Sequence, residues 1–265
     1  MNQVAVNPSN VLYLWPLRTL YIGQLGRLSP MSQGAHALMF ALDAPLSVRI
    51  GEHEYRSRSL LVPAGTRFHP DTRGQRIACC FLDPLGRDFL YLQSQMRRCH
   101  EGVYVESVRQ AEQLATLERL WQQGADARTA YRQLTDVLFP GTSTQVPGFS
   151  VDGRIARVVD MIRADPADNI SNDELAARVG LSGARLQRLF KESTGIPIRR
   201  YRLWHRLFVT SSMMAMGSTL TDAALAAGFS DSSHLTHVFR SMLGMKPSMV
   251  LRRSRDMRIL VGTDQ

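Results

Sequence analysis

The carboxyl-terminal part of the chain contains the same helical pattern twice, and this duplication constrains the fold more than any other feature. The corresponding residues are Gly180 and Gly228, Leu186 and Leu235, Phe190 and Phe239, and Gly195 and Gly244. The first pair is 48 residues apart and the other three are 49 residues apart. Each copy predicts a short helix, a glycine turn, a second helix and a glycine stop, which is the form of a helix-turn-helix unit.

Local signals predict where these helices begin and end. Ser171 and Glu174 have the spacing of a capping box, and Asp231 can cap the helix that follows it. We therefore expect an all-helical region with helices over residues 152–164, 173–179, 183–192, 198–216, 221–228 and 232–243.

The second helix of each unit is amphipathic. Its apolar residues, Leu186, Leu189 and Phe190 in the first unit and Leu235, Val238 and Phe239 in the second, are predicted to face the core. The opposite face carries Arg185, Gln187, Arg188 and Lys191 in the first unit, and Ser232, Ser233, His234, Thr236, His237 and Arg240 in the second. Side chains of these types reach base edges and phosphates when a helix enters the major groove of DNA.

The charge distribution agrees with a polyanionic partner. The formal net charge is +9, of which residues 151–265 carry +6 and residues 1–150 carry +3. Between Arg185 and Arg206 there are seven basic residues and one acid, Glu192. Such a cluster favours nucleic acid, because each neutralised phosphate releases counterions. The alternative is an arginine-rich face that is only solvated.

The motifs of the two units resemble the DNA-binding domain of the AraC/XylS family. The first resembling segment is Leu175-Ala176, Ser182 and Leu186–Lys191, and the second is Thr221–Arg240 followed by Gly244 and Pro247-Ser248. The resemblance extends from about Ala156 to Val250, roughly a third of the chain. It implies two helix-turn-helix units on one connecting helix, which read successive major-groove segments on the same face of double-stranded promoter DNA.

The resemblance also implies roles for individual residues. Base-reading positions are Ala184, Gln187, Arg188, Ser232, Ser233, Thr236 and His237, and DNA-backbone contacts are Arg185, Lys191, Arg199, Arg200 and Arg240. Ala184 replaces a larger side chain of some relatives, and His237 stands where the family often has arginine, which weakens the readout expected of the second unit. Arg206 lies within the long helix, where we expect it to pair internally with an acid rather than to contact DNA. RNA polymerase, a small-molecule effector and a second copy of the chain are the further partners that the family resemblance implies.

The amino-terminal half predicts many short strands. Strand patterns cover Arg18–Leu28, Ala35–Leu42, Ser47–Ile50, His53–Arg56, Leu60–Val62 and Arg76–Leu82, with a hairpin turn at Gly51-Glu52. The segment from Ser59 to His69 resembles a cupin strand-turn-strand. We therefore predict an α+β chain, with an amino-terminal cupin-like β-barrel or sandwich, accompanying helices, and an all-α double helix-turn-helix domain.

Two helical patterns follow the strands. Apolar residues between Val105 and Trp121, Val108 among them, fall on one predicted helical face, which either pairs with a second copy or covers the sheet. A second helix is expected over residues 127–138. The turn-forming segment after it is the expected linker. We predict an effector and dimerisation domain over 1–140, a linker over 141–150 and the DNA-binding domain over 151–265.

The amino-terminal half lacks a motif for catalysis. His36, His53 and His69 are isolated, without the His-x-His pair of a metal cupin, so no metal, cofactor or catalytic residue is predicted. Cys79 and Cys80 are adjacent in a predicted strand, where their side chains point to opposite faces, which favours a buried structural role over a thiol sensor.

Several residues of this half are compatible with ligand binding without requiring it. The aromatic residues Trp15, Tyr21, Phe40 and Phe68 can line a pocket or only a core. Six arginines suit either an anionic effector or solubility: Arg18, Arg27, Arg49, Arg67, Arg73 and Arg76.

Composition narrows the class of protein. Hydrophobic residues make up 44% and charged residues 21% of the chain, which is typical of a globular protein. A membrane-spanning segment and a secretory signal are not predicted, and three cysteines indicate a reducing compartment, so we expect a cytoplasmic protein. The leading hypothesis is a transcription regulator controlled by a small molecule. The alternatives are control by a protein partner and, less favoured, a cupin-type enzyme with a helical accessory domain.

Overall fold

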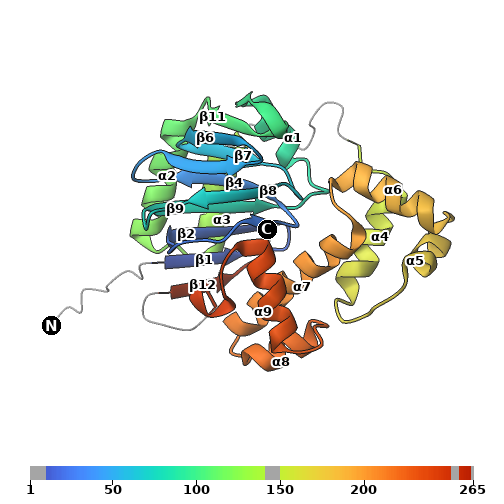
Figure 1. Ribbon diagram of the computed structural model, residues 1–265. Helices are drawn as coiled ribbons and strands as arrows, with labels where there is room; N and C mark the ends of the chain where they lie inside the picture. The colour runs from blue at the N-terminus through green and yellow to red at the C-terminus, as the bar shows by residue number, and fades with distance from the viewer. Residues whose placement is uncertain (1–9, 141–149, 252–256, 264–265) are drawn as a thin grey trace.

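Two β-sheets form the amino-terminal half of the chain in a computed structural model, which describes residues 10–140, 150–251 and 257–263 (Figure 1). The larger sheet has the strand order β10-β11-β7-β4-β9-β2-β1-β12. Its strands are β1 (Asn10–Leu14), β2 (Arg18–Gln24), β4 (His36–Ala41), β7 (Ser59–Val62), β9 (Arg76–Leu82), β10 (Met96–Arg98), β11 (Tyr104–Ser107) and β12 (Met257–Val261).

The smaller sheet has the strand order β3-β8-β5-β6. Its strands are β3 (Met31–Ser32), β8 (Arg67–Asp71), β5 (Leu46–Ile50) and β6 (His53–Ser57). The predicted hairpin is confirmed, since β5 pairs antiparallel with β6 around Gly51. Within the described ranges the strands form sandwich-like sheets without closing into a barrel, so the sandwich alternative of the predicted α+β fold is the one observed.

Two helices cover the face of the larger sheet that points away from the helical half (Figure 1). They are α2 (Gln110–Gln123) and α3 (Ala127–Leu138), and the short helix α1 (Asp88–Ser94) follows β9. Leu117 and Leu134 bury completely in the same cluster as Leu20 and Phe40 of the sheet. The predicted start of the first helix is wrong, because Val105 lies in β11 and Val108, 74% exposed, precedes the helix.

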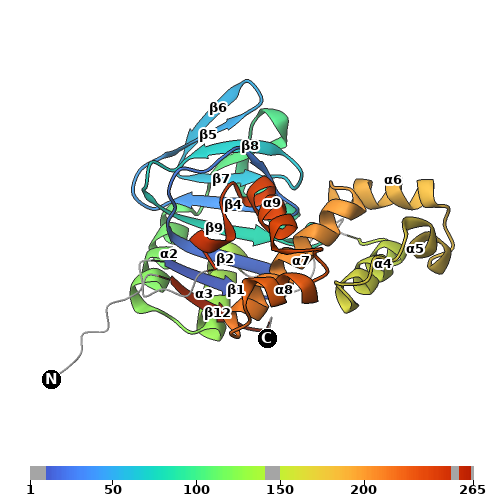
Figure 2. The same cartoon turned by 60° about the horizontal axis from the view of Figure 1, so that its bottom comes forward.

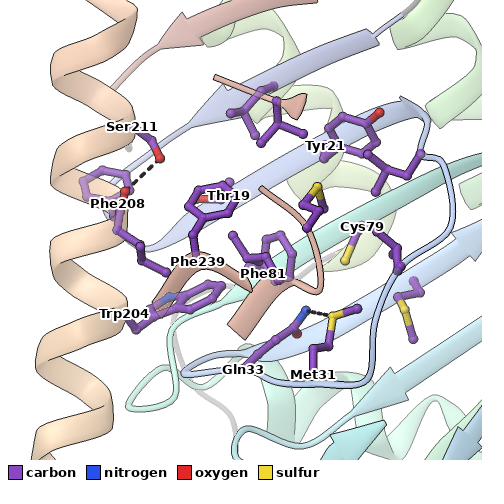
Figure 3. Close-up of a pocket in the computed structure, with 18 of the residues that line it drawn as sticks. Thr19, Tyr21, Met31, Gln33, Cys79, Phe81, Trp204, Phe208, Ser211 and Phe239 are labelled. Atoms are coloured by element: carbon purple, nitrogen blue, oxygen red, sulfur yellow. Dashed lines mark hydrogen bonds between the residues drawn. The ribbon is translucent and has the colours of Figure 1, made fainter. Parts of the chain in front are cut away.

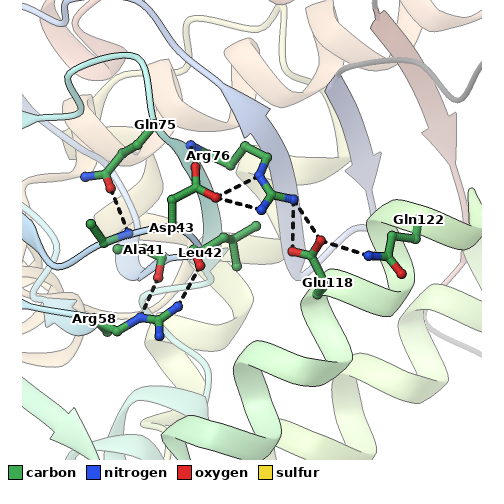
Figure 4. A network of polar contacts seen from close by, with 9 residues as sticks. Ala41, Leu42, Asp43, Arg58, Gln75, Arg76, Glu118 and Gln122 are labelled. Atoms are coloured by element: carbon green, nitrogen blue, oxygen red, sulfur yellow. Dashed lines mark hydrogen bonds and ion pairs between the residues drawn. The ribbon is translucent and has the colours of Figure 1, made fainter.

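Arg76 ties the larger sheet to the helix α2 (Figure 4). Its guanidinium donates to Asp43 at 2.6 Å and to Glu118 on α2 at 2.8 Å, and it lies 4.8 Å from the ring centroid of Trp121. Burial opposes ionisation of Asp43, but the hydrogen bonds from Arg76 outweigh it and lower the pKa of that carboxyl. The position of α2 against the sheet therefore depends on specific polar contacts as well as on apolar packing.

The carboxyl-terminal half is helical (Figure 2). Its helices are α4 (Gly153–Ala164), α5 (Asn172–Arg178), α6 (Gly183–Thr194), α7 (Ile198–Ala215), α8 (Leu220–Ala226) and α9 (Ser232–Leu243). The predicted helices are confirmed, although α8 begins earlier than expected, because Thr219 and not Thr221 is its cap. None of the helices in the described ranges combines the length and hydrophobicity that a bilayer crossing requires.

The last strand returns to the amino-terminal sheet. β12 pairs in parallel with β1, from Asn10 opposite Met257 to Leu14 opposite Val261, and the Gly262 N–H donates to the Leu14 carbonyl at 3.0 Å. A strand from within residues 151–265 thus completes a sheet that otherwise consists of strands from the first half. Most of the predicted linker, 141–149, lies outside the described residues.

Three clusters of buried apolar residues hold the molecule together. One lies between the sheet and the helices α2 and α3. The second lies between the two sheets and continues without interruption into the second helix-turn-helix unit through Leu207, Leu235 and Phe239. The third belongs to the first unit, with Leu186 and Phe190, and among the described residues it reaches the amino-terminal half at Ala64 and Leu85. The two units are therefore joined to the sheets in different ways.

Candidate nucleic-acid interface and interdomain cavity

The two helical units have the same turn at the level of individual hydrogen bonds. Gly180 and Gly228 adopt φ values of 67° and 87°, in the left-handed region that favours glycine. The residue after each glycine donates its N–H to the residue five positions earlier at 2.9 Å: Leu181 to Ala176 and Phe229 to Ala224. The turns therefore aim the second helix of each unit in an equivalent way.

Side-chain caps fix the start of each second helix. The Ser182 hydroxyl accepts from the Arg185 N–H at 3.3 Å, and the Asp231 carboxylate accepts from the His234 N–H at 2.8 Å. The hydrogen bond from the His234 N–H is the main reason that the pKa of Asp231 is lowered. Caps of this type place the first turn of the helix, which carries residues predicted to read bases.

The helix α6 presents its predicted DNA-facing residues to solvent. Its exposed residues include Ala184, Arg185, Gln187, Arg188 and Lys191. Leu186 and Phe190 on the other face are completely buried. The only ion pair on this face among the described residues joins Arg188 and Glu192 at 3.7 Å, with both side chains more than half exposed, so a phosphate or base can displace it at little cost.

The helix α9 has a narrower open face. Ser233, His237 and Arg240 are exposed, whereas Ser232 and Thr236 are half-buried. The Thr236 hydroxyl donates to the Ser232 carbonyl at 2.8 Å within the helix, which leaves its methyl group and oxygen lone pairs for other contacts. The seven predicted base-reading residues thus lie on two helices, and each helix gathers its own set on its outer side.

The predicted DNA-backbone arginines of α7 differ from one another. Arg199 is exposed, while Arg200 donates to the carbonyl and the hydroxyl of Ser32 at 2.9 and 2.6 Å. Arg206 is bonded internally, as expected, but to other groups than an acidic side chain. Its guanidinium donates to the carbonyls of Pro166 at 2.8 Å and Asp168 at 3.5 Å and to the Asn169 side chain at 2.9 Å. Burial lowers the pKa of Arg206.

The connecting helix α7 packs directly on the amino-terminal half. Trp204 meets Phe81 of β9 edge to face at 5.2 Å between ring centroids. Gly34 allows this approach, because a Cβ atom there would lie 2.4 Å from the Trp204 Cβ. The Ser29 N–H donates to the Gly244 carbonyl at 2.9 Å and adds a backbone contact at the end of α9.

An apolar cavity lies at this junction (Figure 3). It has a volume of about 90 Å³. Strands β1, β2 and β9 form one wall with Leu12, Tyr21 and Cys79, and helices α7 and α9 form another with Phe208 and Phe239. The cavity therefore connects the sheets with the helices that position the second helix-turn-helix unit.

One buried polar group at the cavity lacks a hydrogen-bond partner. Gln33 is 4% exposed, its Nε2 donates to the Met31 sulfur at 3.6 Å, and its Oε1 has no partner within the described part of the chain (Figure 3). A buried amide oxygen without a partner is costly, which makes the Gln33 Oε1 a natural point of attachment for a hydrogen-bond donor of a ligand.

The predicted pocket aromatics lie on opposite sides of the larger sheet, with Phe68 contributed by β8 of the smaller sheet. Tyr21 and Phe68 line the cavity, whereas Trp15 and Phe40 pack beneath α2 and α3. Cys79 and Cys80 also point to opposite faces, as predicted, and both are buried free thiols. Burial raises the pKa of Cys79 and raises that of Cys80 to about 12, so both remain protonated and unreactive at neutral pH.

A polar cluster joins the helices α4 and α7, which pack against the first helix-turn-helix unit, to the end of strand β9. Arg163 of α4 donates to Asp83 at 2.5 Å, and the Tyr201 hydroxyl of α7 donates to the same carboxylate at 3.2 Å. Burial raises the pKa of Tyr201, which keeps its hydroxyl a donor. His205, beside this cluster, has a pKa lowered to about 4 by burial, so it is neutral at physiological pH.

The three histidines considered as metal ligands lie apart in separate surroundings. His36 is buried, accepts from the Ala64 N–H at 3.0 Å and stacks on Phe89, while His69 donates to the Leu28 carbonyl at 2.9 Å. His53 is exposed and stacks on His100. Among the described residues, no three His, Cys, Asp or Glu side chains come together as metal ligands.

Sequence reasoning missed the cavity and the interdomain contacts. Most of the cavity residues are ordinary apolar side chains from eight strands and helices, and nothing in a local pattern distinguishes them from other core positions. Of the aromatic residues proposed from the sequence to line a pocket, Tyr21 and Phe68 do so, but the sequence could not distinguish them from Trp15 and Phe40.

Comparisons with known proteins agree with the helical geometry. A family model described as a helix-turn-helix domain matches residues 175–253. The HTH-type transcriptional regulator RipA of Corynebacterium glutamicum is 35% identical over 91 residues, 34% of this chain and 28% of RipA. The HTH-type transcriptional activator RhaS of Yersinia pestis is 31% identical over 121 residues, 45% of this chain and 44% of RhaS. The matched part is less than half the length of each of these relatives.

The overall fold is similar to that of ToxT from Vibrio cholerae. A crystal structure of ToxT from strain O395 has a TM-score of 0.59 at 13% identity, over 88% of this chain and 96% of that chain. Wild-type ToxT with a bound unsaturated fatty acid has a TM-score of 0.59 at 15% identity, over 89% and 95% of the two chains. The predicted combination of a β-rich half and a double helix-turn-helix half is confirmed.

Proposed function

We propose, from the premise that the carboxyl-terminal region of this chain is an AraC-type helix-turn-helix domain, that the protein binds specific sites on double-stranded promoter DNA and regulates transcription. It acts by binding and not by catalysis. The single observation that carries this proposal is that α6 and α9 both expose predicted DNA-reading residues to solvent. The buried residues of α6 and α9 face two separate cores, while Gln187 and Arg188 on one helix and Ser233 and His237 on the other face solvent.

The residue types on the two helices divide the work of recognition. Gln187 and Arg188 can each form two hydrogen bonds with a purine, and Ser232, Ser233, Thr236 and His237 can adapt to several base edges. Ala184 offers only a methyl contact. In this proposal Arg185, Lys191, Arg199 and Arg240 contact phosphates. Arg200 joins them only when its bonds to Ser32 are released.

The connecting helix sets the distance between the two reading helices. α7 has 18 residues, which corresponds to about 27 Å along its axis. Successive major-groove segments on one face of B-DNA lie about 34 Å apart. Since α6 precedes α7 and α9 follows it in the chain, a connecting helix of this length can carry the two reading helices toward adjacent segments.

We further propose that the cavity binds an apolar small-molecule effector. Its lining is apolar apart from a few groups such as Tyr21, Ser211 and Gln33, and the Gln33 Oε1, which has no partner among the described residues, suits one hydroxyl or protonated carboxyl of the ligand. ToxT, which has a similar fold, has been solved with an unsaturated fatty acid bound. These two points favour control by a small apolar molecule over control by a protein partner.

The size of the cavity suggests how the effector acts. Its volume of about 90 Å³ is smaller than the roughly 150 Å³ cavity that accommodates benzene in an engineered protein. A larger ligand therefore requires α7 and α9 to move away from the sheet. Binding then selects an arrangement in which the second unit lies differently relative to the first, and it changes DNA affinity only if the two arrangements bind DNA unequally.

The remaining partners in the proposal follow from the family resemblance. They are a second copy of the chain, which pairs through the amino-terminal half, and RNA polymerase at the regulated promoter. Since α2 covers the sheet with Leu117 and Leu120, a dimer contact through this helix would use its outer face.

The test starts from the purified full-length chain and a pool of random duplex DNA. Repeated selection at low ionic strength should enrich one sequence with two half-motifs, and the affinity for it should exceed that for scrambled DNA by at least 10³-fold. The binding is then measured again with a long-chain unsaturated fatty acid. A selected site without any effect of fatty acids would retain the DNA-binding proposal and remove this class of effector, whereas enrichment of no sequence would contradict DNA recognition itself.

A further inference from the structure

A groove of about 580 Å³ lies beside the helix α9, where this helix packs on the amino-terminal half of the chain. Its walls come from the first turn of α7, the side of α9, and the paired strands β3 and β8. It is distinct from the apolar cavity, although Met31 lines both. We call it the interdomain groove.

The interdomain groove has only positive or neutral lining groups. It is lined by the arginines Arg67, Arg199 and Arg200 and by the histidines His234 and His237, and no carboxylate belongs to its lining within the described ranges. None of these arginines forms an ion pair with another described residue. By contrast, Arg18 and Arg76 in the same half of the chain are bound to Asp88, Asp43 and Glu118.

Contacts between the two halves hold these positive groups together. Arg200 donates to the carbonyl and the hydroxyl of Ser32, and Ser32 is the register partner of Arg67 across β3 and β8. The bond from Ser29 to Gly244 fixes the end of α9 beside the same strands. Arg67 on the sheet and Arg199 on α7 are both exposed and both line the groove, although they are 132 residues apart in the sequence.

Three cations without a counter-charge repel one another, so their close placement favours an anionic ligand. The groove is open to solvent along the side of α9, where His237 also belongs to the face predicted to read bases. A helix that enters a major groove has a sugar-phosphate strand along each side. The groove lies where one of those strands would run.

We propose that the interdomain groove binds the phosphate backbone of the DNA segment read by α9, and that Arg67 of the amino-terminal half is a DNA-backbone contact. This inference rests on the proposed DNA-binding function and adds a contact outside the helix-turn-helix domain. It follows that the affinity for DNA depends on how closely the two halves are held together. A ligand that separates α9 from the sheet would separate Arg67 from the bound strand as well.

The test compares the full-length chain with its Arg67→Gln variant on the selected duplex. Fluorescence anisotropy gives the dissociation constant at several KCl concentrations between 50 and 200 mM. Loss of one phosphate contact should reduce the slope of log affinity against log salt by about 0.9, so that the weakening is three- to fourfold greater at 50 mM than at 200 mM. The sequence preference should remain the same, because phosphate contacts do not read bases.

Arg56→Gln is the matched control. Arg56 is also an exposed arginine of the smaller sheet, but it lies on β6, at the opposite edge from β3. Its loss changes the net charge equally and should leave the salt slope unchanged. Arg67→Lys should keep the slope, and equal melting temperatures establish that all variants are folded.

The outcomes separate this inference from the function on which it rests. If the wild-type chain binds no duplex, the proposed function fails. If the wild-type chain binds and Arg67→Gln has the wild-type slope, or if Arg56→Gln loses as much slope, Arg67 does not contact DNA. An Arg67-dependent rise in melting temperature with inorganic pyrophosphate, together with an unchanged slope, would assign the groove to a free phosphate ligand and overturn the inference.

Discussion

Replacing Phe239 by alanine tests whether the second helix-turn-helix unit shares its core with the β-sheets. Phe239 is 1% exposed and borders the apolar cavity. Its counterpart in the first unit, Phe190, is completely buried in a separate core. Removing a buried phenylalanine side chain costs about 3–5 kcal/mol in the free energy of unfolding, and each 100 Å³ of unfilled space accounts for about 2.4 kcal/mol.

The position of Phe239 places its loss near the upper end of this range. Its neighbours already leave about 90 Å³ unfilled, so they are poorly placed to collapse into the space that the ring vacates. We expect Phe239→Ala to lower the free energy of unfolding by about 4–5 kcal/mol. Phe190→Ala should lower it by about 3–4 kcal/mol, which includes the loss of the edge-to-face contact with Tyr201.

Hydrogen exchange measured by mass spectrometry shows which helices and strands each substitution destabilises. Phe239→Ala should accelerate exchange in α7 to α9 and also in β1, β2 and β9, the strands that line the cavity. Phe190→Ala should accelerate exchange in α4 to α6 and leave these strands protected. The reasoning is refuted if Phe239→Ala leaves the strands at wild-type protection, or if Phe190→Ala loosens them to the same extent.

Three further substitutions address other contacts. Gly34→Ala should cost about 1–3 kcal/mol in urea denaturation, because its Cβ would lie 2.4 Å from that of Trp204; wild-type stability would show that the two halves do not pack this closely. Arg188→Ala should weaken binding to the selected site by about 1–3 kcal/mol and relax one base position, whereas Lys191→Ala should weaken all sequences alike; equal effects of both variants on all sequences would make Arg188 a phosphate contact. Burial lowers the pKa of His36 from 6.5 to about 4 in the folded chain. As the pH falls from 6.5 to 4, the unfolded chain binds a proton at His36 that the folded chain does not, so the free energy of unfolding decreases. His36→Gln should remove about 2 kcal/mol of the difference in unfolding free energy between pH 7 and pH 5, and an undiminished difference would exclude His36 as its source.

Elements with local signals could be predicted closely from the sequence. The helix α9 was predicted over Ser232–Leu243, because Asp231 caps its start and Gly244 ends it. The strand β9 was predicted over Arg76–Leu82 from its composition. The outward position of Gln187 and Arg188 also followed from the helical period alone.

Elements that depend on distant partners could not be predicted. The strand β8 contains Pro70, which argues against a strand unless its partner is known. β12 is a five-residue strand whose parallel partner β1 begins 247 residues earlier, at Asn10. The close approach of Gly34 to Trp204 likewise has no trace in either local sequence, since it exists only after the two halves have packed.

The same distinction between local signals and distant partners applies to the candidate site. The base-reading residues are periodic on two helices and could therefore be proposed from the sequence, while the effector cavity draws its residues from strands and helices of both halves. Arg67 shows the difference most clearly. As one of the six arginines named as compatible with an anionic effector, it was indistinguishable from Arg76 in the sequence. Only the structure separates the arginine that faces an open groove from the arginine bound to Asp43.

Hydroxyl-radical footprinting of the full-length chain on its selected duplex tests most directly whether the two outward-facing helices read DNA together. Two protected segments about one helical turn apart on the same face of the duplex are expected, with Arg188→Ala changing protection in one segment and His237→Ala in the other. A single protected segment of half that length, or two variants that alter the same segment, would contradict recognition by both units.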